Sequence, residues 1–222
     1  VCYNCGEKEP VIEYVDIANV SDLIAFANRV NAGETTLNGR LVANIDLKGA
    51  SWTPIGIYCP GGDVTKSVFF RGIFNGNGYT VSNFTVSGTD CVGLFGYAEM
   101  ATIMNLGVIN ATMTGWNAGA ICGYAPTATI INCYAIGCNI TGNTTNPIAI
   151  NSEAVHVGAI AGSNAGTVKN CYAVNCTLSI KFVGQFNSMS PLGGVICSNN
   201  YYSNVSGTFT NTAGATSVTA AQ

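Results

Sequence analysis

Charged residues are scarce in this sequence of 222 residues. It has 8 Lys and Arg against 11 Asp and Glu, so that 9% of the chain is charged, whereas soluble domains average about 25%. The formal net charge is −3 and the pI is near 4.9. This balance argues against nucleic acid and anionic membranes as partners, since both attract a basic surface.

Long apolar runs are absent too. Gly, Asn and Thr interrupt every hydrophobic stretch before it reaches the ~18 residues that are needed to cross a membrane. We therefore expect no membrane insertion. The hydrophobic content of 48% nevertheless predicts a folded core.

Titratable residues are too few and too scattered to suggest a catalytic or metal site. His156 is the only histidine, and Glu153 is the only carboxylate after Glu99. A general base or a metal ligand at His156 would therefore lack the convergent partners that it needs. We predict no catalytic residue, no metal and no cofactor, and we expect that the protein is not an enzyme.

Cysteine, in contrast, is abundant, with ten in the chain. An even number beside one histidine favours disulfides over zinc or catalysis, and so an oxidising compartment. Because the chain starts at Val1 rather than at Met, we also interpret it as a processed, secreted protein. The disulfide candidates are Cys2, Cys5, Cys59, Cys91, Cys122, Cys133, Cys138, Cys171, Cys176 and Cys197.

Asn-x-Ser/Thr motifs are frequent, although a chain this rich in Asn, Ser and Thr produces several by chance. Each is an acceptor for N-glycosylation if the protein passes through a eukaryotic secretory pathway. The glycosylation candidates are Asn19, Asn83, Asn110, Asn139, Asn143, Asn175 and Asn204.

An internal repeat organises the chain. Gly119–Ile140 reads GAICGYAPTATIINCYAIGCNI, related versions lie at Val92–Met113 and Val157–Leu178, and Gly193–Asn200 begins a fourth copy. Aligned on their first shared glycine, the copies follow at steps of 26, 39 and 36 residues. A step of this size at ~3.3 Å per extended residue is enough for one coil of three short strands and turns.

Alternation within each copy predicts which residues face the core. The predicted inward residues are Ile121, Ile131, Cys133, Ala135, Cys138 and Ile140, with Ile160, Cys171, Ala173, Cys176 and Leu178 in the next copy. These residues would stack into columns inside a solenoid. At a corner we expect Asn105, Asn132 and Asn170 to form an amide ladder, because Asn tolerates left-handed backbone.

One helix is predicted, at Asp22–Val30, behind a cap at Ser21. Its apolar stripe consists of Leu23, Ile24, Phe26, Ala27 and Val30. We predict a single domain over residues 1–222, in which 1–40 form an N-terminal cap with the helix at 22–30, 41–206 form the coils and 207–222 form a β-prone tail.

Insertions lengthen the second and third steps at one place in the repeat, Gly142–Ala154 and Lys181–Pro191. Equivalent insertions emerge on one face of a solenoid, which is often the binding face. The binding-loop candidates are Phe182, Gln185, Phe186 and Asn187.

The repeats resemble the GLUG-motif repeats of bacterial and protist surface proteins. Gly-x-Ile-x-Gly elements followed by Ile-x-Asn-Cys-Tyr-Ala carry the resemblance, and Trp52–Gly56, Phe70–Gly78 and Val92–Gly96 resemble what precedes such repeats. The resemblance spans about Ile17 to Ser206. It implies an all-β fold, a right-handed parallel β-helix, in a secreted or cell-surface protein such as an adhesin. It implies no activity, since the shared residues are Gly, Asn and core positions.

The repeated cysteines allow three interpretations. Neighbouring coils place equivalent Cα atoms ~4.8 Å apart, which a disulfide accepts. Vertical bonds Cys133–Cys171 and Cys138–Cys176 are possible, as are bonds Cys133–Cys138 and Cys171–Cys176 within each rung. The third interpretation is buried free thiols that pack as small hydrophobic groups.

We first expect a disulfide-stabilised extracellular structural protein that associates end to end into a filament or surface layer. The helix can cap the N-terminal end, whereas Thr208–Gln222 is β-prone, nearly uncharged and shows no helical cap. The alternative is an adhesin that binds a glycan or a cell-surface protein through the loops between rungs.

Two other roles are less favoured. A polysaccharide-processing enzyme would need paired carboxylates, which the repeats lack. An ice-binding protein would need a regular threonine array, and the threonines do not recur at one rung position. We interpret Tyr134 and Tyr172 as an outward aromatic stack in preference to a sugar platform.

Overall fold

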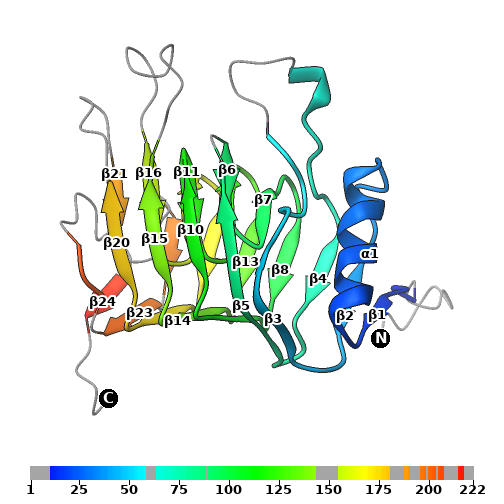
Figure 1. Cartoon of the computed structure of the whole chain (residues 1–222), viewed down its shortest axis with the longest axis horizontal. Helices are drawn as coiled ribbons and strands as arrows, with labels where there is room; N and C mark the ends of the chain where they lie inside the picture. The colour runs from blue at the N-terminus through cyan, green and yellow to red at the C-terminus, as the bar shows by residue number, and fades with distance from the viewer. Residues whose placement is uncertain are drawn as a thin grey trace, which may run out of the picture.

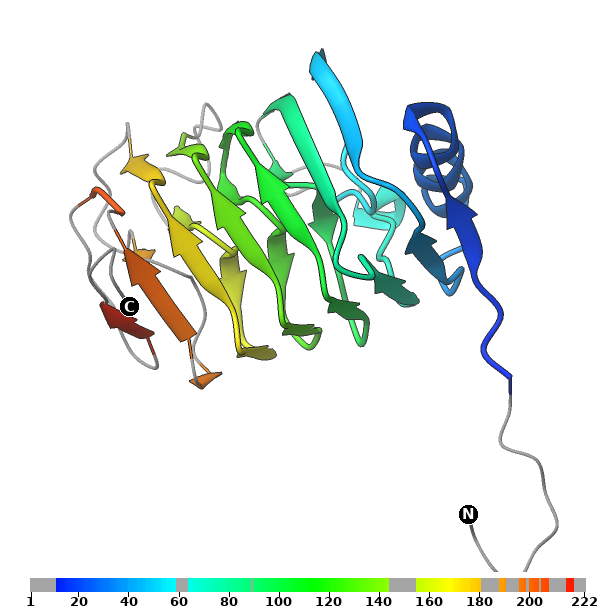
Figure 2. The same cartoon turned by 90° about the horizontal axis from the view of Figure 1, so that it is seen from below.

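The chain folds into a parallel β-solenoid with one N-terminal helix, as predicted. The computed structural model describes residues 11–58, 64–88, 90–143, 155–180, 188–190, 196–198, 200–203, 205–207 and 215–217. The coils lie side by side along one axis, from helix α1 at one end to the C-terminal strands at the other (Figures 1 and 2).

Four parallel sheets run along this axis. The first sheet contains β1 (Val15–Ile17), β2 (Gly39–Leu41), β4 (Ile73–Asn75), β8 (Thr102–Met104), β13 (Thr129–Ile131), β18 (Thr167–Lys169) and β22 (Ile196–Ser198). The second sheet contains β20 (Thr177–Ile180), β15 (Asn139–Gly142), β10 (Thr112–Gly115), β5 (Thr80–Ser87), β9 (Gly107–Ile109), β14 (Tyr134–Ile136), β19 (Tyr172–Val174), β23 (Asn200–Ser203) and β24 (Ala215–Ser217), with β3 (Ile45–Ser51) beside β5.

The third sheet contains β21 (Ser188–Ser190), β16 (His156–Gly158), β11 (Asn117–Gly119) and β6 (Cys91–Val92). The fourth sheet contains β17 (Ala161–Asn164), β12 (Cys122–Ala125) and β7 (Phe95–Tyr97), and a short 3₁₀ helix, η1, spans Val64–Lys66. The second sheet covers two sides of the solenoid, because the start of β5 pairs with β9 and its end pairs with β10.

Asparagine residues form one corner of successive rungs. Asn105, Asn132 and Asn170 have φ angles of 54°, 54° and 52°. The Nδ2 atoms of Asn132 and Asn170 each donate to the Oδ1 atom of the preceding rung's Asn, and Asn105 donates to Asn75, all at 3.1 Å. The predicted ladder is confirmed and extends one rung further, to Asn75.

The same corners interrupt the period-2 alternation, which makes one predicted core residue wrong. Ile130 is fully buried, and Ile131, which we expected to face inward, is partly exposed. The left-handed residue Asn132 bends the chain, so that Cys133 and Ile131 face opposite ways although they are two residues apart. Counting along the sequence fails wherever a corner of this kind intervenes.

Helix α1 (Val20–Asn31) is longer than predicted and begins at a different cap. Asn19, not Ser21, is the N-cap, since its Oδ1 accepts the backbone N–H of Asp22 at 3.0 Å. Ile24 was assigned to the apolar stripe wrongly, because its side chain is 44% exposed. The helix residues that are buried are Leu23, Phe26, Ala27 and Val30.

The helix covers the N-terminal end of the core (Figure 1). The ring of Phe26 makes edge contacts with Phe70 and Phe74, with centroids 6.2 and 5.6 Å apart. Further along the axis the core narrows to smaller groups, as in the columns Ile103, Ile130, Val168 and Val108, Ala135, Ala173.

Candidate functional site

The two ends of the solenoid have opposite properties. At the N-terminal end, α1 covers the core and β3 contains a bulge, where the register shifts between Asp46 and Ala50 and Lys48 has a φ angle of 53°. The edge strand β1 also carries Asp16 in an ion pair with Arg40. A covering helix, a bulge and charged side chains are devices that keep a sheet edge from pairing.

At the C-terminal end, the first sheet ends with β22, the third with β21 and the fourth with β17. The second sheet ends with β20 on one side of the solenoid and with β24 on the other. The two of these strands whose side chains are described, β17 and β20, carry no charged residue. This end therefore lacks, in the part of the chain that the structure describes, the protection present at the other end.

A continuous column of polar residues joins the two ends. Strand register places Ser51, Thr85, Thr112, Asn139, Thr177 and Ser206 one behind another, all exposed. Our expectation that threonines do not recur at one rung position was thus wrong. The next column is less accessible, since Thr141 is 9% exposed and its Oγ1 lies 3.0 Å from Ser179 Oγ, so the face is not a uniform hydroxyl array.

Corner geometry accounts for several glycosylation motifs. Asn83, Asn110 and Asn175 lie at a second corner, with φ angles of 55°, 52° and 54°. Each is followed by a buried residue and then by a Thr of the exposed column, so the coil itself produces Asn-x-Thr.

The glycosylation candidates differ in accessibility. Nδ2, the atom that a glycan would modify, donates to Asp46 in Asn83 and to Asp22 in Asn19, both at 2.9 Å. Asn139 belongs to the exposed column, and Asn143 follows β15 in a half-buried position. Asn204 lies outside the described residues, and glycosylation at all seven motifs stays a prediction.

The expected disulfides are absent from the described cysteines. Six cysteines are buried and form no disulfide: Cys91, Cys122, Cys133, Cys138, Cys171 and Cys176. Their positions one rung earlier are occupied by ordinary core residues, Leu106 before Cys133 and Ala111 before Cys138. The thiols therefore pack as small apolar groups. Cys2, Cys5 and Cys59 lie outside the described residues, as does the side chain of Cys197.

Burial also makes the thiols of Cys122, Cys133 and Cys138 poor nucleophiles. It raises the pKa of Cys122 to about 12 and that of Cys133 well above its usual value. The pKa of Cys138 is raised first by its hydrogen bond with Cys176 and then by burial. Neutral thiols of this kind do not support cysteine catalysis.

An aromatic cluster packs against the core around the fourth sheet, and one of its members, Trp116, is part of the core itself. We define it as Tyr58, Phe69, Tyr97, Trp116 and Tyr124. The rings of Tyr97 and Tyr124, on neighbouring strands, are 4.9 Å apart, and Phe69 lies 4.3 Å from Tyr97. Tyr58 lies within 5.7 Å of both tyrosines and stacks on Trp116 at 6.0 Å.

Two buried polar atoms beside this cluster have no hydrogen-bond partner among the described residues, Trp116 Nε1 and Asn117 Oδ1. Trp116 is 8% and Asn117 is 2% exposed. The Nδ2 of Asn117 is 3.6 Å from the Sγ of Cys91. Nothing in the sequence indicated this site, because its residues come from separate segments.

Electrostatically the cluster is nearly neutral. Desolvation raises the pKa of Tyr97 to about 12 and also raises that of Tyr124, so both phenols keep their protons. Arg71, whose guanidinium lies 5.0 Å from the Phe69 ring, is paired with Glu99 at 2.5 Å. Burial lowers the pKa of His156, the next residue after Asn117 in its column, and favours the neutral imidazole.

The predicted binding loop lies in a part of the chain that the structure does not describe. Phe182, Gln185, Phe186 and Asn187 lie outside the described residues. Within the ranges that are described, no group of three or more His, Cys, Asp or Glu side chains could hold a metal ion. No helix in those ranges has the length and apolar character that crossing a membrane requires.

The solenoid is similar to a known crystal structure, described as that of a putative immunoglobulin A1 protease from Bacteroides ovatus. The TM-score is 0.54 at 18% sequence identity, and the alignment covers 91% of this chain and 81% of that one. At this identity the likeness concerns the fold alone. No protein-family profile matches the chain, and no curated protein sequence matches it. The GLUG resemblance therefore stays a prediction from the motifs.

Proposed function

We propose that this protein is an extracellular structural protein, not an enzyme, whose copies associate through the C-terminal end of the solenoid into a filament or surface layer. The contrast between the two ends carries this proposal. A blunted N-terminal end and an uncharged C-terminal edge leave one end suited to pairing with another chain.

Two further observations support an extracellular, non-enzymatic role. The resemblance of the repeats to those of surface proteins favours secretion. The number of cysteines no longer supports an oxidising compartment, because the described cysteines form no disulfide. Ion pairs engage all three arginines of the chain, as Arg29–Glu34, Arg40–Asp16 and Arg71–Glu99. Charged side chains that are paired with one another are less available for chemistry.

The blunted end favours contact between two C-terminal ends. Such an interface is isologous, and it closes at a dimer unless a second contact extends it. The side formed by β9, β14, β19 and β23 offers that contact, because its outward residues are largely apolar. Tyr134 and Tyr172 stack there with centroids 5.0 Å apart, and Tyr201 is 48% exposed.

The chain offers a matched pair of variants to test the proposal. Ser206 and Ser51 are exposed serines at opposite ends of one column. Sedimentation velocity over a wide concentration range should show that the wild type associates, that Ser206→Lys weakens association at least about tenfold, and that Ser51→Lys does not. A monomeric wild type, or equal effects of the two variants, would refute the proposal.

A charge exchange then identifies which ends meet. If two C-terminal ends meet, a mixture of Ser206→Lys and Ser206→Glu should associate more strongly than either variant alone. If ends meet head to tail, Ser206→Lys should instead be rescued by Ser51→Glu. The second result would contradict contact between two C-terminal ends while preserving self-association.

A second candidate function is adhesion, and the aromatic cluster is the observation that favours it. The partners that such a surface would bind are glycans and cell-surface proteins. Deleting both Asn143–Glu153 and Lys181–Pro191 tests the predicted loop contacts. Unchanged cell binding after this deletion would count against adhesion through the loops.

A further inference from the structure

We propose that the aromatic cluster binds a neutral saccharide, with the ring of Tyr124 as the platform and with Trp116 Nε1 and Asn117 Oδ1 as polar anchors. This site does not depend on self-association, since it involves neither β20 nor Ser206. It could therefore be present in a monomer or in an assembled protein.

The platform results from a change of residue along one column. Tyr97 and Tyr124 are neighbours in register, and the next residue in the column is Ser163. Tyr97 and Tyr58 both pack against Tyr124, but on the side away from Tyr97 the column continues with a hydroxymethyl group in place of a ring. Tyr124 is half-buried, so part of the ring is accessible for stacking against the apolar face of a sugar.

The two polar atoms supply complementary hydrogen-bonding capacity. Trp116 Nε1 is a donor only, and Asn117 Oδ1 is an acceptor. Both are buried and lack a partner among the described residues. A buried polar group without a partner calls for an explanation such as a water molecule or a ligand, and a sugar hydroxyl can accept one hydrogen bond while donating another.

The charge balance selects a neutral sugar over an acidic one. Arg71 and Glu99 offset each other, and His156 is held in its neutral form by burial. Tyr97 and Tyr124 keep their protons for the same reason. None of the five cluster residues is a cation, so a carboxylate or sulfate on the ligand would lose its hydration without an opposite charge from them.

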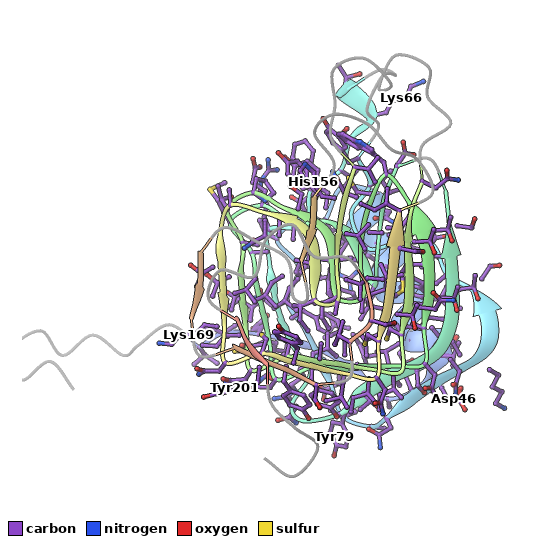
Figure 3. All side chains as sticks on the ribbon, turned by 90° about the vertical axis from the view of Figure 1, so that its left-hand side faces the viewer. Asp46, Lys66, Tyr79, His156, Lys169 and Tyr201 are labelled. Atoms are coloured by element: carbon purple, nitrogen blue, oxygen red, sulfur yellow. The ribbon has the colours of Figure 1, made fainter. Side chains whose placement is uncertain are left out.

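The other aromatic group of the surface lacks this geometry. Tyr134 and Tyr172 stack with an interplanar angle of 5°, so the two rings cover each other's faces. Figure 3 shows Tyr201, the next residue in that column, at the lower edge of the cross-section and His156 at the upper edge. Tyr172, which is 39% exposed, therefore provides a control tyrosine away from the proposed site.

Binding can be tested on the full chain with the methyl glycosides of glucose, galactose, mannose and N-acetylglucosamine, and with glucuronic acid as the charged comparison. Saturation-transfer NMR detects contact and calorimetric titration measures affinity. We expect at least one neutral glycoside to bind and glucuronic acid to bind more weakly.

Four variants locate the site. Tyr124→Ala should weaken binding about tenfold or more, and Tyr124→Leu, which preserves apolar volume, should do the same if the first variant folds poorly. Trp116→Phe keeps a ring but loses the N–H donor and should weaken binding about fivefold. Tyr172→Ala should bind as the wild type does.

The proposal is overturned if the folded wild type binds none of the neutral glycosides. It is also overturned if Tyr124→Leu and Trp116→Phe, with native circular dichroism, bind like the wild type, or if Tyr172→Ala loses as much affinity. None of these results bears on association through the C-terminal end, which the variants at Ser206 test separately.

Discussion

Replacing Asn132 with Ala would remove the middle of the amide ladder. Asn132 donates to Asn105 and accepts from Asn170, both at 3.1 Å, and its φ angle is 54°. The substitution thus removes two hydrogen bonds. It also places alanine in left-handed backbone, where it lacks the side-chain amide that lets Asn adopt this conformation.

The expected loss of stability follows from these two terms. A net hydrogen bond contributes about 0.5–1.5 kcal/mol, and because Asn132 is exposed, we take about 0.5–1 kcal/mol for each. Left-handed backbone costs Ala about 1 kcal/mol or more. Asn132→Ala should therefore lower the free energy of unfolding by about 2–3 kcal/mol.

Urea unfolding, followed by circular dichroism, measures this difference, and Asn132→Gly separates the two terms. Glycine loses the same hydrogen bonds but accepts the positive φ angle, so it should be about 1 kcal/mol more stable than the alanine variant. The reasoning is refuted if the two variants are equally stable, or if both match the wild type. A double variant with Asn170→Ala should be less destabilised than the sum of its parts, since both changes remove one shared bond.

Three further predictions concern the core and pH. Gly119→Ala should destabilise by about 3 kcal/mol or more, since a β-carbon would lie 2.4 Å from Cys122 O and 2.6 Å from Gly162 N, whereas Gly88→Ala, with no atom closer than 3.9 Å, should have little effect in the same urea assay. At pH 8 maleimide should label Cys122 only after denaturation, and non-reducing peptide mapping should find it unlinked; rapid native labelling would contradict its burial. Burial lowers the folded-state pKa of His156 below 6.5, so the unfolded chain binds more protons than the folded chain. Stability should therefore fall as the pH drops below about 6.5, and His156→Gln should reduce this dependence on pH. Parallel pH profiles of stability for the two proteins would refute this prediction.

The cysteines show how far sequence patterns reach. Matching spacing correctly placed Cys133 beside Cys171 and Cys138 beside Cys176 in neighbouring rungs. The spacing could not decide whether the sulfurs are bonded to each other. A core position that holds Leu or Ala in one rung can hold an unbonded thiol in the next rung. Only the structure shows that the six described cysteines form no disulfide.

The predictions of the helix cap and of one inward residue were wrong for local reasons. Ser21 and Asn19 are both good capping residues, and the choice depends on where the chain leaves β1. Ile130 and Ile131 are equally apolar, so the position of the corner decides which one is buried. These errors shift boundaries by one or two residues and leave the repeat unchanged.

The sequence by itself determined the coil. Repeated Gly, Asn and apolar residues predict rungs, corners and core columns, because each rung must satisfy the same backbone geometry as its neighbour. The tertiary structure decided what the surface offers. The blunted end, the uncharged end and the cluster around Tyr124 each combine segments that are distant in the chain, and only folding brings their side chains within reach of one another.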